Sequence, residues 1–326
     1  MISMKDIAME TGVSRATVSY VLNGRYRADL KISEPVVRKV RAAAERMGYV
    51  RNKLVKSIVS GESRVIAIIS PFPDYLLPTI KGCAEEAARH DCLIKLIPLT
   101  DDINQAVMQA VEFRVAGIFA ISLKNEVIQK VNPKFFSYGI PSIGLTPNSG
   151  RMAFDQTASS RRGTEYLIAQ GHRRIVFLGG KSPITFERAE GYREAMRDHH
   201  LSEEVLLMET SSSAQEEREM YYERVIRMRP AAVQCSSDHF ALNLMNACYK
   251  RKLFIPDWFS VLGFGNLPGS AFSSPHLTTV NEPYYETGRV MFRRIYRLIY
   301  EGKETEPEKL IGEVIERDSV KTFKSE

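Results

Sequence analysis

The chain has 326 residues, 44% of them apolar and 26% charged, which is typical of globular proteins and sufficient for two or three domain cores. It contains no run of about 18 apolar residues, which excludes a membrane-spanning helix, and no apolar segment resembling a secretory signal follows Met1. We therefore expect a cytoplasmic protein with no membrane partner.

The net charge of +6 is concentrated at the amino end. Residues 1–64 hold 13 Lys and Arg against 6 Asp and Glu, a net charge of +7, and the remainder of the chain carries −1. Such asymmetry indicates a basic module that binds a polyanion, attached to a nearly neutral body.

Three helices are predicted in the basic segment. They cover about residues 3–10, 14–22 and 33–47, with Gly12 ending the first and Ser14 capping the second. Two helices joined by a short glycine-containing turn form a helix-turn-helix, in which the second helix enters the major groove of DNA. The sequence therefore predicts an all-α DNA-binding head.

The second helix carries three side chains that we expect to contact bases. Arg15 can donate two hydrogen bonds to guanine, Ala16 offers a methyl group to thymine, and Tyr20 can reach a base edge or a phosphate. The alternative is an ordinary solvated helix face, the usual interpretation of an isolated run of charges. The charge, the turn glycine and the capping residues together favour DNA binding.

The neighbouring hydroxyl, amide and guanidinium groups are suited to phosphate oxygens, which position a protein on DNA without reading its sequence. The residues in this predicted DNA-backbone set are Ser14, Thr17, Ser19, Asn23, Arg25, Arg27 and Ser33.

The amino-terminal sequence also resembles a known family. "MKDIAMETGVSRATVSYVLNG", followed by "VRKVRAAAERMGYVRN", resembles the DNA-binding domain of LacI–GalR family transcriptional regulators, with the DIA, TGVS, TVS, VLNG and AAxxxGY elements in order. The resemblance implies a regulator, most often a repressor, that binds a pseudo-palindromic double-stranded DNA operator as a homodimer.

Residues 50–63, "VRNKLVKSIVSGES", correspond to the hinge of that family. The resemblance implies a segment that becomes helical when two chains meet on DNA. It places Ile58 at the position that wedges into the minor groove, with Val55 and Lys56 as groove-facing neighbours. An apolar wedge unstacks base steps and bends the DNA. Alternatively, Ile58 is a linker residue that packs on the body.

The body, residues 64–326, alternates short β-branched runs with amphipathic helical segments. The runs lie at 65–70, 93–98, 117–122, 142–145, 174–180, 231–235 and 260–265. Strands buried on both faces and joined by helices form parallel sheets, and two successive series predict two similar α/β lobes.

The resemblance extends through the body in "YLIAQGHRRIVFLGG", "FERAEGYREAM", "SVLGFG", "SSPHLTTVNEP" and "IERDSV". It implies the two-lobed periplasmic-binding-protein type I fold, with three crossovers and a ligand cleft between the lobes. The expected divisions are a head at 1–49, a hinge at 50–63, lobe 1 at about 64–154 and 283–303, and lobe 2 at about 155–282 and 304–326.

The resemblance implies that the cleft binds a small-molecule effector, a sugar or sugar derivative. Ligands of open parallel sheets bind at the carboxyl ends of the strands, which places Phe72 and Tyr75 at the rim as stacking candidates. Both could equally be rim packing. "RAEGY" matches the family block whose arginine binds effector, placing Arg188 in the cleft, and the alternative for Arg188 is a surface arginine.

Two departures from the family pattern affect this cleft. Ser237-Asp238 stands where the family has Asn-Asp, and Gly265 stands where an aspartate often accepts hydrogen bonds from sugar hydroxyls. The polar groups left to orient a ligand are Asp155, Ser237, Asp238 and Asn266. A standard hexose-binding mode is therefore not expected.

We expect neither a metal nor another cofactor, and no enzymatic activity. The four cysteines lack metal-ligand spacing and are expected to be buried thiols: Cys83, Cys92, Cys235 and Cys248. No phosphate-binding loop, metal motif or nucleophile–base arrangement is evident.

The sequence leaves two alternatives open. In one, the same DNA-binding dimer responds to a partner protein rather than to a small molecule, which the glycine at 265 favours. In the other, the chain is a free solute-binding protein, against which the basic head and the lack of a signal peptide argue.

Overall fold

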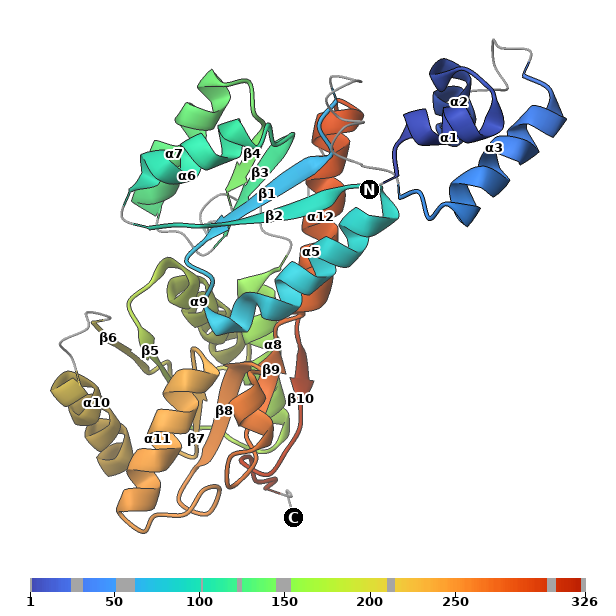
Figure 1. Ribbon diagram of the computed structural model, residues 1–326. Helices are drawn as coiled ribbons and strands as arrows, with labels where there is room; N and C mark the ends of the chain where they lie inside the picture. Colours follow the sequence, from blue (N-terminus) through green and yellow to red (C-terminus); the bar gives the residue numbers. More distant parts are fainter. Residues whose placement is uncertain are drawn as a thin grey trace. The chain divides into compact units, whose positions relative to one another are not determined.

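The computed structural model describes residues 2–24, 32–50, 62–100, 102–121, 125–144, 154–209, 215–303 and 309–323 (Figure 1). Its contacts divide the chain into two compact units, Met1–Ser63 and Arg64–Glu326.

The first unit is built from three short helices. They are α1 (Met4–Thr11), α2 (Arg15–Leu22) and α3 (Glu34–Arg46). Their apolar faces meet in one core of seven buried side chains: Ile7, Val18, Val21, Val37, Val40, Ala43 and Ala44. The three predicted helices are confirmed to within about two residues at each end.

Local hydrogen bonds fix where these helices begin and end. Ser3 and Asp6 form a reciprocal capping box at the start of α1, and Gly12 ends that helix in the left-handed conformation, with φ of 68°. The Ser14 hydroxyl accepts a hydrogen bond from the Thr17 amide at the start of α2. Ser33 precedes α3, where a hydroxyl commonly caps a helix, but its side chain makes no capping hydrogen bond.

The first lobe of the second unit is a parallel sheet in the order β2-β1-β3-β4. Its strands are β1 (Val65–Ser70), β2 (Leu93–Pro98), β3 (Gly117–Ala120) and β4 (Ser142–Gly144). Its helices are the short 3-10 helix η1 (Asp74–Leu76), α5 (Leu77–Arg89), α6 (Ile103–Glu112), α7 (Asn125–Ser137) and α12 (Tyr284–Tyr300). One core cluster joins the sheet to α6 and α7 and another joins it to α5 and α12, so helices cover both faces (Figure 1).

The second lobe is a sheet in the order β10-β9-β8-β7-β5-β6, parallel except for the edge strand β10. Its strands are β5 (Ile175–Gly180), β6 (Val205–Met208), β7 (Ala232–Cys235), β8 (Ser260–Gly265), β9 (Thr278–Asn281) and β10 (Glu313–Ile315). Its helices are α8 (Gln156–Ala169), α9 (Pro183–Asp198), α10 (Gln215–Met228), α11 (Asp238–Lys250) and the short 3-10 helix η3 (Pro268–Ala271). Core clusters place α10 and α11 on one face and α8 and α9 on the other.

The chain returns from lobe 2 to lobe 1 directly after β9. Helix α12 begins at Tyr284 and packs along α5, where Gly288 faces the backbone of Thr79 and Cys83 so closely that a Cβ atom would clash. The Arg289 side chain bonds Glu86 of α5 at 2.9 Å. After α12, β10 pairs with β9, so the chain ends on lobe 2.

Buried His172 should make the stability of the fold pH-dependent. Burial lowers the pKa of His172 to about 4, and the charge of Arg173 acts in the same direction. Because the folded-state pKa lies below the usual value of 6.5, the unfolded chain binds the extra proton. The stabilisation is complete above pH 6.5 and should fall by up to about 3 kcal/mol as the pH drops toward 4.

Urea unfolding between pH 7.5 and 4.5 measures this effect. His172→Gln, which removes the titrating group, should flatten the dependence of the unfolding free energy on pH in this window. An equally steep dependence in the variant would assign the effect to other groups.

Candidate effector cleft and DNA-binding helix

A cavity of about 280 Å³ lies in the second unit, where the two lobes face each other. Side chains from both lobes line it, and most follow the carboxyl ends of strands, where open parallel sheets bind ligands. Its apolar walls are Leu76, Ile121, Ile184, Phe240, Phe264, Leu267 and Met291, together with the rings of Tyr75 and Tyr284. The other lining side chains include Thr185, Arg188, Ser236, Ser237, Glu282 and Thr287.

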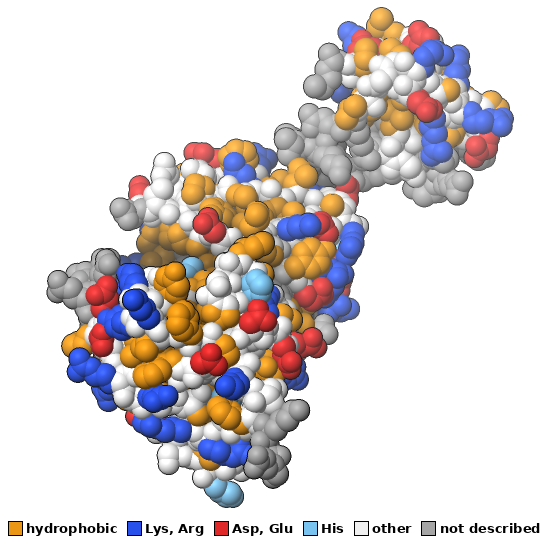
Figure 2. Space-filling model, turned by 90° about the horizontal axis from the view of Figure 1, so that it is seen from below, with side chains coloured by type: hydrophobic (Ala, Val, Ile, Leu, Met, Phe, Trp, Pro, Cys, Tyr) orange, Lys and Arg blue, Asp and Glu red, His pale blue; other side chains and the backbone are white. Residues whose placement is uncertain are grey.

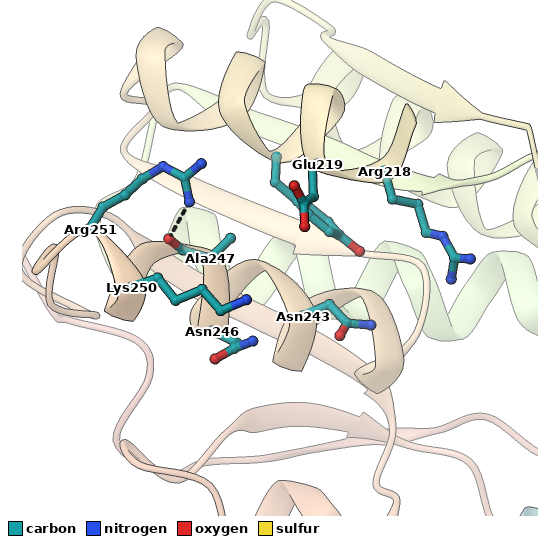
Figure 3. A pocket seen from close by; sticks show the side chains of 8 residues that line it. Arg218, Glu219, Asn243, Asn246, Ala247, Lys250 and Arg251 are labelled. Atoms are coloured by element: carbon teal, nitrogen blue, oxygen red, sulfur yellow. Dashed lines mark hydrogen bonds between the residues drawn. The ribbon is translucent and has the colours of Figure 1, made fainter. Parts of the chain in front are cut away.

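A different hollow, of about 320 Å³, lies between α10 and α11 of lobe 2 (Figure 3). Its lining includes Arg218, Glu219, Asn243 and Lys250, with Arg251 donating a hydrogen bond to the Ala247 carbonyl at 2.8 Å. All of these side chains belong to one lobe, and none follows a strand end. A ligand there could not bridge the lobes, so the inter-lobe cavity is the candidate effector site.

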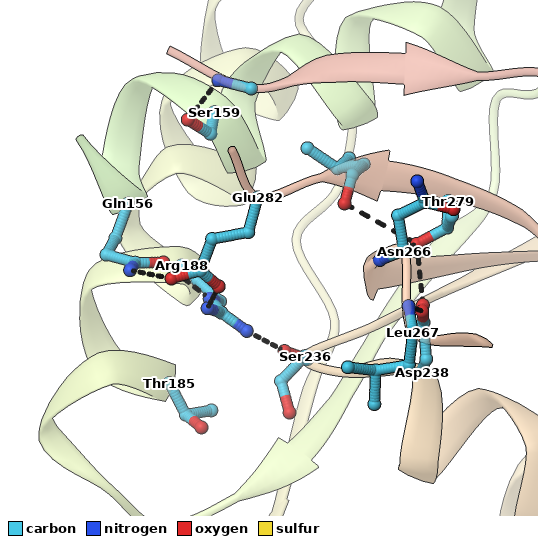
Figure 4. Close-up of polar contacts among 12 residues, drawn as sticks. Gln156, Ser159, Thr185, Arg188, Ser236, Asp238, Asn266, Leu267, Thr279 and Glu282 are labelled. Atoms are coloured by element: carbon cyan, nitrogen blue, oxygen red, sulfur yellow. Dashed lines mark hydrogen bonds and ion pairs between the residues drawn. The ribbon is translucent and has the colours of Figure 1, made fainter. Parts of the chain in front are cut away.

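Arg188 lies at the centre of the polar wall of that cavity (Figure 4). Its guanidinium donates from Nε to Gln156 Oε1 at 2.7 Å, from Nη1 to the Ser236 carbonyl at 2.6 Å and from Nη2 to Glu282 Oε2 at 2.9 Å. The same group stacks 3.7 Å from the centroid of the Phe264 ring. These contacts hold Arg188 in one orientation and neutralise its charge within the protein.

Asp238, the first residue of α11, organises the loop that follows β8. Its buried carboxylate accepts hydrogen bonds from the Thr279 hydroxyl at 2.6 Å, the Leu267 amide at 2.7 Å and the Ser270 hydroxyl at 2.5 Å (Figure 4). The three bonds fix the loop on which Leu267 faces the cavity. Asp238 therefore influences the shape of the cleft indirectly, through the position of Leu267.

Helix α2 of the first unit has one buried and one exposed face. Val18 and Val21 are buried in the core, whereas Arg15, Ala16 and Tyr20 are exposed. Figure 2 shows Lys and Arg side chains around the visible face of this unit. An exposed cation and a phenol on a helix whose other face is buried form a surface suited to the major groove.

The polar residues beside that face help to form the helix. The Ser14 and Thr17 hydroxyls are hydrogen-bonded at 2.9 Å, and the Asn23 side-chain amide donates to the Ser19 hydroxyl at 3.0 Å. Ser14 is exposed, and Thr17, Ser19 and Asn23 are partly exposed. Their DNA-backbone contacts remain a prediction.

Two parts of the chain match known families. Residues 3–52 match the bacterial regulatory proteins of the lacI family, and residues 164–320 match the periplasmic binding protein-like domain. The chain therefore contains a lacI-family regulatory domain followed by a periplasmic binding protein-like domain. It is a regulator of transcription rather than an enzyme, and the predicted fold class, a helical head followed by a two-lobed α/β body, is confirmed.

Whole-chain comparisons agree with this assignment. The probable HTH-type transcriptional repressor ExuR of Bacillus subtilis (strain 168) is 28% identical, covering 98% of this chain and 99% of its own. The lac repressor dimer bound to operator and the anti-inducer ONPF has a TM-score of 0.78 at 20% identity, covering 98% of this chain and 99% of that chain. The complex of the transcriptional regulator CelR with cellobiose has a TM-score of 0.67 at 21% identity, covering 98% and 100%. At such identity the two structures show the fold alone.

Of the effector residues predicted from the lacI-family sequence, Tyr75, Arg188 and Ser237 line the cavity. Four others lie off its lining: Phe72, Asp155, Asp238 and Asn266.

Each of these four residues has another structural partner. Phe72 packs on the core beneath α5, and Asp155 caps the start of α8. The Asn266 side chain bonds those of Asn281 at 3.1 Å and Arg317 at 2.7 Å. These partners lie outside the lining of the cavity, and direct contact of these side chains or of Asp238 with a ligand remains a prediction.

Gly265, where the lacI family often has aspartate, cannot readily be replaced by a larger residue. Its φ of 123° disfavours any side chain, and a Cβ atom there would lie 3.5 Å from the Tyr284 hydroxyl and 3.9 Å from Asp238 Oδ2. The carboxylate that lines the cleft belongs to Glu282 instead. Sequence reasoning missed Glu282 because β9, which ends immediately before it, was not among the predicted strands.

Five of the predicted DNA contacts lie outside the described residues: Arg25, Arg27, Val55, Lys56 and Ile58. Among the described ranges, no helix is both long and apolar enough to cross a membrane. In the same part of the chain, no group of three or more His, Cys, Asp or Glu side chains is placed to hold a metal ion.

The four cysteines are buried free thiols, as predicted. Burial raises the pKa of Cys83 and of Cys248 to about 12, and it also raises the pKa of Cys92 and Cys235. Because the thiolate is the reactive form, these side chains act as small apolar groups in the core.

Proposed function

We propose that this protein is a cytoplasmic lacI-family transcriptional repressor that binds a pseudo-palindromic operator as a homodimer. Its affinity for DNA is controlled by a small molecule, a sugar or sugar derivative, bound in the inter-lobe cleft. The exposed face of α2, with Arg15, Ala16 and Tyr20 opposite a buried face, is the observation that carries the DNA-binding part.

The cavity shared by both lobes supports the effector part. A ligand that contacts both lobes has a different affinity for different lobe arrangements, and this difference sets how far it can shift the protein between them. The similar CelR structure contains cellobiose, and the similar lac repressor structure is a dimer on operator. Tyr75, Arg188, Ser237 and Glu282 are the ligand contacts we propose.

In this proposal, the segment between the head and the body couples effector binding to DNA affinity. Residues 50–63 form the hinge between the head, 1–49, and the body, 64–326. Ile58 enters the minor groove, Val55 and Lys56 lie beside it, and Arg25 and Arg27 contact phosphates.

Arg15→Ala should reduce operator affinity by about 1–3 kcal/mol and relax the preference for one base pair in each half-site. Selection from a random duplex pool with the full chain first defines the operator, which should be two-fold symmetric. Binding of the variant to single-base-pair operator variants then locates the position that Arg15 reads.

Arg38→Ala is the matched control, because it removes the same charge from an exposed site on α3. It should leave the base preference unchanged. If Arg15→Ala weakens binding to every duplex equally, Arg15 contacts phosphate rather than a base.

Glu282 also bears on the alternative that a partner protein regulates the dimer. That alternative drew support from the missing carboxylate at Gly265, whereas Glu282 places a carboxylate in the cleft. The structure thus favours the small molecule, and stabilisation of the purified protein by a sugar would separate the two hypotheses.

A further inference from the structure

The cleft contains one buried ion pair. Arg188 and Glu282 side chains are only 8% and 13% exposed, and their Nη2 and Oε2 atoms are 2.9 Å apart. They are the only Arg, Lys, Asp or Glu side chains among the described residues that line the cavity. The formal charges of Arg188 and Glu282 therefore cancel each other within the cleft.

This pair leaves Arg188 poorly suited to bind an acid. Three of its five N–H groups already donate, to Gln156, Ser236 and Glu282. A ligand carboxylate at the guanidinium would either displace Glu282 or lie beside it as a second buried negative charge. Like charges in a shared, poorly hydrated site repel, so both routes weaken binding.

Glu282, by contrast, retains capacity to accept hydrogen bonds. A carboxylate offers about four lone-pair sites. Oε2 accepts from Arg188, Oε1 accepts a long bond of 3.5 Å from Gln156, and the carboxylate also hydrogen-bonds with Tyr284, which leaves about one lone-pair site for a ligand. Burial, the charge of Glu282 and a hydrogen bond with it raise the pKa of Tyr284, which remains a neutral phenol beside the pair. A ligand hydroxyl could therefore donate to Glu282.

The remaining walls suit an uncharged ring. Tyr75 and Tyr284 have ring centroids 6.0 Å apart, and Ile121, Phe264 and other apolar side chains line the same cavity. Such surfaces pack against the C–H face of a sugar ring. In addition, the buried Thr287 hydroxyl has no hydrogen-bond partner within the described part of the chain, although it lines the cavity.

We infer that this cleft selects a neutral sugar ring over the corresponding sugar acid, and that Glu282 is the residue that sets this preference. Its carboxylate accepts a ligand hydroxyl, compensates the charge of Arg188 and repels a ligand carboxylate. This inference rests on the proposed function, since it names the class of effector that the same site takes.

The test uses matched pairs of probes on the full chain. Each pair consists of a neutral pyranose and its uronate. The pairs are glucose with glucuronate, galactose with galacturonate, and mannose with mannuronate; cellobiose is added as a neutral disaccharide. Ligand-dependent thermal stabilisation identifies binders, and calorimetry gives their Kd. Wild-type protein should bind at least one neutral probe and bind its acid at least about tenfold more weakly.

Three variants separate the effect of side-chain charge on ligand affinity from the effect of side-chain shape. Glu282→Gln leaves Arg188 uncompensated, so the uronate should gain about tenfold or more in affinity while the neutral probe loses affinity. Arg188→Gln and the double variant Arg188→Gln/Glu282→Gln lack the uncompensated cation and should gain nothing for the uronate. The ligand-free thermal transition of each variant establishes that it is folded.

The outcomes are distinct. Equal or tighter binding of a uronate by the wild type, no stabilisation by any neutral probe, or no gain for the uronate in folded Glu282→Gln would each overturn the inference. If Glu282→Gln fails to fold, the affinities of the wild type for each neutral probe and its acid still test whether the cleft prefers the neutral sugar. Operator binding is measured separately, and its absence would contradict the proposed function instead.

Discussion

Replacing Asp238 by alanine should lower the free energy of unfolding by about 3–5 kcal/mol. The Asp238 carboxylate is fully buried and accepts three hydrogen bonds, from Thr279, Leu267 and Ser270. Alanine leaves all three donors without this acceptor, and a buried donor without a partner costs about 1–3 kcal/mol. Denaturant unfolding of the full chain measures the loss.

The same substitution should also weaken effector binding, because the Leu267 amide is one of the released donors and Leu267 lines the cleft. Asp257→Ala is the control, since Asp257 is an exposed aspartate on the same lobe, 3.5 Å from Lys321, and should change stability by less than about 1 kcal/mol. A loss no larger for Asp238→Ala than for Asp257→Ala would show that the three bonds contribute little.

Arg188→Ala should abolish the effector response and also destabilise the body by about 3–5 kcal/mol. The destabilisation follows because Glu282, only 13% exposed, would keep its charge without its partner. The loss of response follows because Arg188 lines the cleft and holds Gln156, Ser236 and Glu282 in place. Urea unfolding and effector-dependent release of operator DNA measure the two effects.

A double-mutant cycle tests the origin of the stability loss. Arg188→Ala/Glu282→Gln removes the unpaired charge, so it should be more stable than Arg188→Ala alone. Arg193→Ala, five residues along α9, removes a partly exposed arginine whose ion pair with Glu190 is 3.4 Å long, and should cost less than about 1 kcal/mol. If the double variant is no more stable than Arg188→Ala, the cost arises from lost packing on Phe264 instead.

The sequence was most informative where local chemistry decides the structure. Residues 65–70 and 260–265 are mainly apolar runs, and each is a fully buried strand at the predicted limits, whereas residues 93–98 form the edge strand β2, also at the predicted limits. Ser14 caps α2 as predicted, because a hydroxyl before a helix has an amide within reach in the first turn. These features depend on residues close together in the chain.

The sequence was least informative where partners are distant. Strands β6 and β9 and helix α10 were missed, and β9 is only four residues long with threonines at half of its positions. The role of Asp238 depends on residues 29 to 41 positions away, and that of Arg188 on a partner 94 positions away. No local pattern reveals such pairs, so the sequence predicts a direct ligand contact for Asp238 and gives no signal for Glu282.

The placement of Glu282 and Tyr284 links ligand contact in the cleft to the position of helix α12. Glu282 follows β9 and Tyr284 is the first residue of α12, so both belong to the segment that connects lobe 2 to lobe 1. A ligand that contacts them therefore contacts this connection directly. Helix α12 has 17 residues and is about 25 Å long. A tilt of about 5° at its first turn would displace its far end by about 2 Å, so a small movement beside the ligand would become a larger movement at the carboxyl end of α12.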